Sequence, residues 1–103
     1  MTPLDIVFSA RAGRQLRALF QYLASEASPI VAERYLSRLT GFCHSLAQFP
    51  NRGLPRPEIL PGLRTITYGR SATIAYLVAE NAVVIMGVYT GGQNYLSALN
   101  EDR

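Results

Sequence analysis

Hydrophobic residues recur at helical spacing through the first half of the chain. One set marks the buried face of a helix predicted over about residues 10–25: Leu16, Leu19, Phe20 and Leu23. A second set alternates steps of four and three residues along the next segment: Tyr35, Leu39, Phe42, Leu46 and Phe49. The second helix is therefore predicted to run from Pro29 to about Gln48.

Residues that favour helix starts precede both sets. The Ser9 hydroxyl can accept a hydrogen bond from a free amide of the first turn. Ser28 can do the same before Pro29, whose missing N–H costs nothing at the first helical position. Only a short link around Ala27 and Ser28 separates the helices, so we expect an antiparallel hairpin.

The second half of the chain alternates with a period of two. Residues 63–68, 73–78 and 83–89 are rich in β-branched and aromatic side chains, and short turns separate them. Such short connections force an antiparallel meander. A further strand, Leu4–Phe8, precedes the first helix, and a short helix is predicted over residues 93–99.

These elements predict one α+β domain over residues 1–103, with the order βααβββ. We expect the helical hairpin to pack on one face of a four-stranded, mainly antiparallel sheet, followed by a short C-terminal helix. The length agrees, because 103 residues can bury one core but not two.

A proline-rich segment, FPNRGLPRPEILPGLR over residues 49–64, joins the two halves. Its prolines restrict the backbone and favour a stiff, extended path. We expect Pro50 to end the second helix and Gly62 to supply a turn before the next strand. The segment is therefore interpreted as a rigid connection that fixes Arg56 and Arg64, rather than as a linker or a mobile lid.

The composition narrows the class of protein. Hydrophobic residues make up 49% of the chain, which excludes a disordered protein, and no apolar run is long enough to span a bilayer. The N-terminus lacks a signal-peptide pattern and Cys43 is the only cysteine, which together favour the cytoplasm. All basic residues are arginines, but a net charge of +3 is too mild to indicate sequence-specific DNA binding by this chain.

Candidate catalytic groups are few. His44 lies opposite the second apolar set and is expected at the surface, whereas Cys43 borders that set and is expected in the core. No cysteines, histidines and carboxylates have the spacing of metal ligands, and Gly91-Gly92 lacks the flanking pattern of a phosphate loop. We therefore predict neither a metal nor a cofactor.

Arginines and tyrosines of the second half are the remaining chemical groups: Arg56, Arg64, Arg70, Tyr68, Tyr76 and Tyr89. Metal-free RNA cleavage needs a base, an acid and cations that stabilise the phosphorane. Arginine can supply the cation and tyrosine the acid, but the chain has no lysine and this half has no histidine. Tyrosines packed on a sheet between exposed arginines explain the same residues equally well, so no catalytic residue is assigned.

One long motif runs through the connection, FP-x-x-G-x-x-R-x-E-I-x-P-G-L-R: Phe49-Pro50, Gly53, Arg56, Glu58-Ile59 and Pro61-Gly62-Leu63-Arg64. The preceding helix adds a second set: Ser28-Pro29, Ala32, Arg34 and Leu39. With the order strand, helical hairpin and meander, the chain resembles the ParE branch of the RelE/ParE toxins of bacterial type II toxin–antitoxin systems. It departs from its relatives at residues 86–91, where they often carry arginine before V-x-H-G, and at Gly92-Gln93-Asn94, where they close with a basic residue and an aspartate.

The resemblance implies a microbial RNase-like fold and a tightly bound, ParD-like antitoxin in a hetero-oligomeric complex. In the ParE branch it implies inhibition of DNA gyrase rather than cleavage of messenger RNA. Six residues are expected at the antitoxin interface, where arginines can bind acidic groups: Arg34, Tyr35, Arg38, Arg56, Arg64 and Arg70. The C-terminal region is expected to face the target: Tyr89, Gln93, Asn94 and Tyr95.

Two alternatives remain open from the sequence. A RelE-like, ribosome-dependent mRNA endonuclease predicts that Arg64 and Tyr89, with Arg70, converge on one concave surface of the sheet. The missing positive charges near the C-terminus disfavour this alternative. A degenerate family member would keep antitoxin binding without toxicity.

Overall fold

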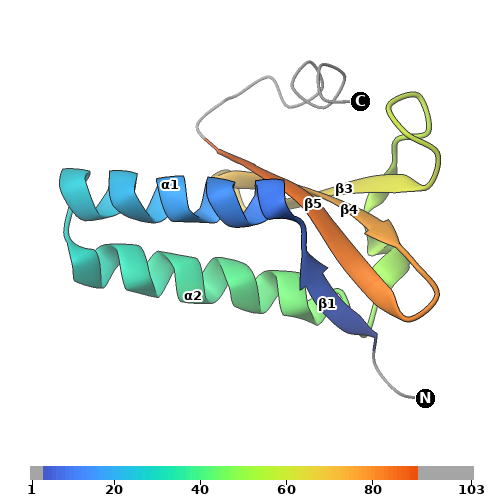
Figure 1. Cartoon of the computed structure of the whole chain (residues 1–103), viewed down its shortest axis with the longest axis horizontal. Coiled ribbons are helices and arrows are strands. Elements are labelled where there is room, and N and C mark those ends of the chain that lie inside the picture. Colours follow the sequence, from blue (N-terminus) through green and yellow to red (C-terminus); the bar gives the residue numbers. More distant parts are fainter. Residues whose placement is uncertain (1–3, 91–103) are drawn as a thin grey trace.

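The computed structural model describes residues 4–90. Its elements follow in chain order: β1 (Asp5–Phe8), α1 (Ala10–Glu26), α2 (Pro29–Ser45), a 3-10 helix (Pro50–Arg52), β2 (Leu54–Pro55), β3 (Leu63–Tyr68), β4 (Ala72–Val78) and β5 (Ala82–Thr90). Figure 1 shows α1 and α2 side by side as an antiparallel hairpin, with the strands forming a second layer.

The strands form one mixed sheet in the order β1-β5-β4-β3-β2. β3, β4 and β5 make the predicted antiparallel meander, whereas β1 pairs with β5 in parallel, with Asp5 opposite Ala82. The β4–β5 pairing shifts register beside Tyr76, which lies opposite Ile85 while the preceding residue lies opposite Gly87. Met86 is therefore the extra residue of a β-bulge.

The helical hairpin and the meander are confirmed, and two details of the prediction are wrong. The sheet has five strands rather than four, because Leu54–Pro55 of the connection adds a short edge strand to β3. α2 ends at Ser45 rather than near Gln48, and Phe49 is 64% exposed instead of completing the apolar stripe. The amides of residues 46–48 bond to carbonyls three residues back, which tightens the chain out of the helix before Pro50. The helix predicted over residues 93–99 lies outside the described residues.

Side chains at the start of α1 attach this helix to the bulge in β5. The Ser9 hydroxyl accepts from the Ala12 amide and donates to the Met86 carbonyl, both at 3.1 Å. The Gln15 side-chain oxygen accepts from the Val88 amide at 2.7 Å. Ser9 is therefore the predicted N-cap and also a link between the layers.

Two apolar clusters lie on opposite faces of the sheet. The larger one joins the helices to the sheet and centres on fully buried side chains: Leu39, Cys43, Leu46, Ile74, Tyr76 and Ile85. The smaller one joins the connection to the other face: Ile59, Leu63, Ala75 and Tyr89. The predicted core position of Cys43 and surface position of His44 are thus confirmed.

Candidate binding surfaces

Tyr76 and Arg64 hold the backbone of the connection against the sheet. The buried Tyr76 hydroxyl accepts from the Gly53 amide at 2.9 Å and donates to the Pro50 carbonyl at 2.7 Å. The Arg64 guanidinium donates to the carbonyls of Asn51 and Gly53, at 3.0 and 2.7 Å. These hydrogen bonds agree with the predicted stiff connection, whose rigidity stays a prediction. Its backbone is folded into a 3-10 turn and a short strand rather than fully extended.

Glycines of the motif have steric roles in this connection. A Cβ on Gly53 would lie 2.6 Å from the Tyr76 hydroxyl and 3.0 Å from the Thr65 carbonyl, so a side chain there displaces a buried ring. Gly62 has φ +83°, a left-handed conformation that favours glycine and that confirms the predicted turn.

Burial changes the acidity of two groups in the larger core. Desolvation raises the pKa of the Cys43 thiol from 9.0 to about 11, so Cys43 is a thiol rather than a nucleophilic thiolate at neutral pH. Desolvation also raises the pKa of Tyr76, against the opposing effects of the Gly53 hydrogen bond and of nearby arginines. Both groups are therefore neutral structural elements.

Arg64 and Tyr89 do not converge. Arg64 lies opposite Tyr76 in the β3–β4 pairing, and Tyr76 belongs to the cluster beneath the helices. Tyr89 packs with Leu63 on the other face and is 5% exposed. The sheet thus separates the two groups that the endonuclease alternative requires on one surface.

An apolar groove of about 470 Å³ opens at the tip of the helical hairpin. Its lining comes from both helices, the β3–β4 turn and the end of β5: Leu19, Tyr22, Leu23, Val31, Tyr35, Arg70, Ser71 and Thr90. Tyr22 is 62% exposed and Val31 45% exposed. The Tyr35 hydroxyl donates to Ser71 at 2.7 Å, which fixes the turn that carries Arg70, the one charged residue in this described lining.

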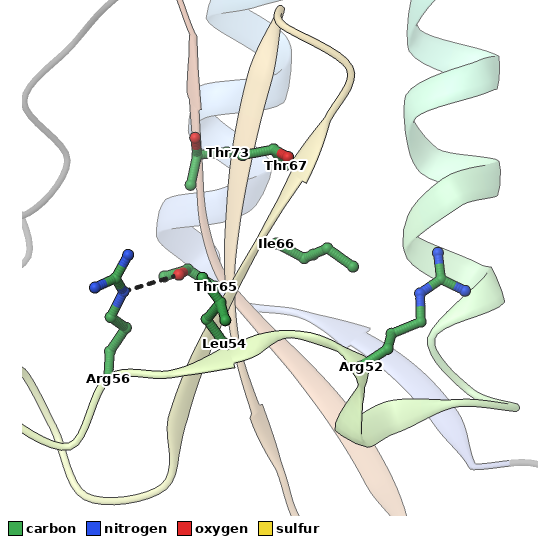
Figure 2. Close-up of a pocket in the computed structure, with 7 residues that line it drawn as sticks. All are labelled: Arg52, Leu54, Arg56, Thr65, Ile66, Thr67 and Thr73. Carbon is green, nitrogen blue, oxygen red and sulfur yellow. Dashed lines mark hydrogen bonds between the residues drawn. The ribbon is translucent and has the colours of Figure 1, made fainter.

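A second cavity, of about 170 Å³, lies at the β2–β3 edge of the sheet. Figure 2 shows its lining residues around β2 and β3: Arg52, Leu54, Arg56, Thr65, Ile66, Thr67 and Thr73. Arg56 Nε donates to the Thr65 hydroxyl at 3.2 Å, and Arg56 NH1 lies 3.9 Å from a Glu58 carboxylate oxygen. The Arg52 guanidinium carbon lies 5.1 Å from the centre of the Phe42 ring, on the side of the helices.

The residues predicted at the antitoxin interface fall in three regions. Tyr35 and Arg70 meet in the groove, and Arg34 and Arg38 are exposed on α2. Arg56 and Arg64 lie at the connection, where both have structural contacts. Their role at an interface stays a prediction.

The residues predicted to face the target are placed only in part. Tyr89 has little exposed surface, and its contact with a target stays a prediction. Gln93, Asn94 and Tyr95 lie outside the described residues.

Sequence reasoning missed Tyr22 and Val31 in the groove and Arg52 at the edge cavity. Tyr22 and Val31 fall outside both apolar sets, so the signal in the sequence was an apolar residue at a position off the predicted buried face. The structure shows that both side chains are exposed. Arg52 occupies a variable position of the connection motif, so only the folded 3-10 turn shows where it lies.

Comparison with known proteins identifies the family. A family model described as the ParE toxin of the type II toxin–antitoxin system parDE matches residues 6–95. The chain belongs to the ParE toxin family. It is a ParE-type toxin of a toxin–antitoxin system. A search of curated proteins found no match.

Solved structures share the ParE-family fold of this chain. The chromosomal ParDE toxin–antitoxin system from P. aeruginosa has a chain with a TM-score of 0.73 and 22% identity, over 84% of this chain and 95% of that one. The toxin–antitoxin complex RelBE2 from Mycobacterium tuberculosis has one with a TM-score of 0.68 and 23% identity, over 87% of this chain and 100% of that one.

Within residues 4–90, no helix is long and apolar enough to cross a membrane, and no three His, Cys, Asp or Glu side chains are placed to hold a metal ion.

Proposed function

We propose that this ParE-type toxin inhibits DNA gyrase in the cytoplasm and that a directly bound, ParD-like antitoxin neutralises it. The observation that carries the proposal is the family match over residues 6–95. The ParDE system named for the P. aeruginosa neighbour supports an antitoxin of the ParD type.

The groove at the hairpin tip is the surface that best fits an antitoxin helix. Exposed apolar groups such as Tyr22 and Val31 can receive the apolar face of an amphipathic helix. Arg70 at the rim can bind an acidic side chain of that helix. Arg34 and Arg38 extend the positive charge along the exposed face of α2.

Inhibition by binding fits the described side chains better than RNA cleavage does. Arg64 donates hydrogen bonds to two backbone carbonyls, and the sheet separates it from Tyr89. Tyr76, the other buried tyrosine of the sheet, is bonded to the connection and has a raised pKa.

The antitoxin surface can be tested with one added carboxylate. Val31→Glu places a charge in the apolar groove, so we expect antitoxin binding to weaken at least tenfold, or by about 1.4 kcal/mol. The antitoxin helix would bury this carboxylate against its apolar face, and the carboxylate would compete with the antitoxin for Arg70. Gln48→Glu is the matched control, because this exposed residue lies beyond the other end of α2. Isothermal titration calorimetry measures the affinity of each variant for the antitoxin, and thermal melting checks that both variants are as stable as the unmodified protein. Weaker binding of Val31→Glu than of Gln48→Glu, at equal stability, supports the proposal. Equal affinity of the two variants would remove the groove from the interface.

The target can be tested by inducing the isolated gene in bacteria. Gyrase inhibition predicts DNA-damage signalling with intact transcripts. Cut transcripts without damage signalling would instead indicate a RelE-like mRNA endonuclease, the alternative that the structural similarity to the RelBE2 complex leaves open. Normal growth without the antitoxin would indicate an inactive family member.

A further inference from the structure

The short turn between β3 and β4, residues 69–71, is attached to α2 at both of its ends. At its start, the Tyr68 ring packs against the Tyr35 ring, with 6.1 Å between the ring centres. At its end, the Tyr35 hydroxyl donates to the Ser71 hydroxyl at 2.7 Å. The Ser71 hydroxyl in turn donates to the Tyr68 carbonyl at 3.1 Å, which closes the turn. The residue between these two attachments is Arg70.

The hydroxyl of Tyr35 has a role that the packing of its ring does not explain. Phe42, seven residues further along α2, packs against the same Tyr68 ring at 5.1 Å and has no hydroxyl. An aromatic ring alone therefore suffices for the contact with Tyr68. The phenol oxygen of Tyr35 serves the hydrogen bond to Ser71, so Tyr35→Phe removes this bond while it keeps the ring.

Arg70 is the charged group that this turn presents to the groove at the hairpin tip. It is exposed, and it supplies the one charge among the described residues of the lining. Within residues 4–90, no carboxylate forms an ion pair with Arg70. An arginine on an attached turn loses less freedom when it binds, so its contact with a carboxylate is stronger than that of an arginine on a loose turn.

We propose that Tyr35 is a positioning residue that makes the groove selective for a helix with a carboxylate on the flank that faces the β3–β4 turn. This inference rests on the proposed function, in which an antitoxin helix occupies the groove. The apolar lining binds the apolar face of an amphipathic helix whatever residues lie beside that face. Arg70 adds the discrimination, because it attracts a carboxylate and repels a cation. The hydrogen bond from Tyr35 to the turn holds Arg70 in the place where this discrimination occurs.

Pairs of synthetic helical peptides, each of about 15 residues, test this selectivity on the full-length toxin. The two members of a pair share one apolar stripe and differ at a single position beside it, which is glutamate in one peptide and glutamine in the other. One pair carries the difference on each flank of the stripe. Fluorescence anisotropy at low salt should show a preference of about three- to fivefold for glutamate on one flank only, in line with an ion pair at an exposed rim. High salt should reduce this preference.

Variants of both partners of the hydrogen bond test the positioning role. In Tyr35→Phe the preference for glutamate should fall below about twofold. Ser71→Ala should lower it as far, the double variant should lower it no further, and Ser71→Thr, which keeps a hydroxyl, should preserve it. Tyr22→Phe is the matched control, because it removes a phenol hydroxyl from the same groove and should keep the preference of the unmodified toxin. Heteronuclear NOE values of the amides of residues 69–71 should be lower in Tyr35→Phe than in Tyr22→Phe, since they report motion of the turn.

The outcomes distinguish the role of Tyr35 from the antitoxin surface itself. A preference that persists in well-folded Tyr35→Phe and Ser71→Ala proteins would overturn the inference. No preference on either flank, or an equal preference on both, would also overturn it, since the second result indicates only a general attraction to a basic protein. If Val31→Glu weakens both members of a pair while Tyr35→Phe leaves their preference intact, the groove stays the antitoxin surface and only the positioning role fails. Peptide binding that ignores Val31→Glu would contradict the proposed antitoxin surface as well.

Discussion

The hydroxyl of Tyr76 is expected to be a main source of rigidity in the connection between helices and sheet. Tyr76→Phe removes one group that accepts from Gly53 and donates to Pro50, while it leaves the buried ring in place. Gly53 is buried, so its amide loses its partner without gaining water, at a cost of about 1–3 kcal/mol. Pro50 is half-buried, and the loss of the hydrogen bond to its carbonyl adds about 1 kcal/mol to this cost.

The expected loss in the free energy of unfolding is therefore about 2–4 kcal/mol, which lowers the Tm of a domain of this size by roughly 10–25 °C. Urea unfolding and thermal melting measure both quantities. Tyr22→Phe is the control, because the Tyr22 side chain is 62% exposed and its change should stay within about 0.5 kcal/mol. A Tyr76→Phe protein as stable as the Tyr22→Phe protein would refute the assigned role of the hydroxyl.

Four further substitutions test other parts of the fold. Gly53→Ala should destabilise the protein by about 1–3 kcal/mol in chemical denaturation, because the added methyl group clashes with Tyr76. Gly41→Ala should instead stabilise the protein by roughly 0.5–1 kcal/mol, because its Cβ has nothing within 4 Å and alanine favours the helix. Arg64→Met should cost about 1–3 kcal/mol in the same assay, because it removes the one guanidinium nitrogen that donates to both carbonyls, and an unchanged midpoint would argue against that contact. The raised pKa of Cys43 means that the unfolded thiol ionises first, so the free energy of unfolding should fall as the pH rises from 9 to about 11. Cys43→Ala should remove that part of the slope, up to about 1.4 kcal/mol per pH unit, and leave the part from Tyr76 above pH 10; an identical slope in both proteins would contradict this account.

The fold was largely predictable because its signals are local. Ser9 and Ser28-Pro29 start the helices where the capping pattern places them, and the strand predicted over residues 63–68 has those bounds in the structure. The connection was harder, since proline content predicts stiffness but not direction. Its turn and its short strand depend on contacts with Tyr76 and Arg64, which come later in the sequence.

The binding surfaces were predictable only in part, for a related reason. Arginine content pointed to Arg70 and Arg56, yet the sequence does not show that one lines an apolar groove and the other an edge cavity. Tyr89 and Arg64 carry the right chemistry for a nuclease, and only the pairing register shows that they lie on opposite faces. The motif of the connection is explained chiefly by packing: Gly53, Gly62 and Arg64 hold the backbone in place.

The most direct test of the proposed function is a supercoiling assay with purified components. Relaxed plasmid, ATP and DNA gyrase are incubated with increasing amounts of the toxin, with and without its antitoxin. We predict that the toxin stops supercoiling and that an excess of antitoxin restores it. Undiminished supercoiling, together with arrest of translation by the same toxin in a cell-free system, would contradict the account.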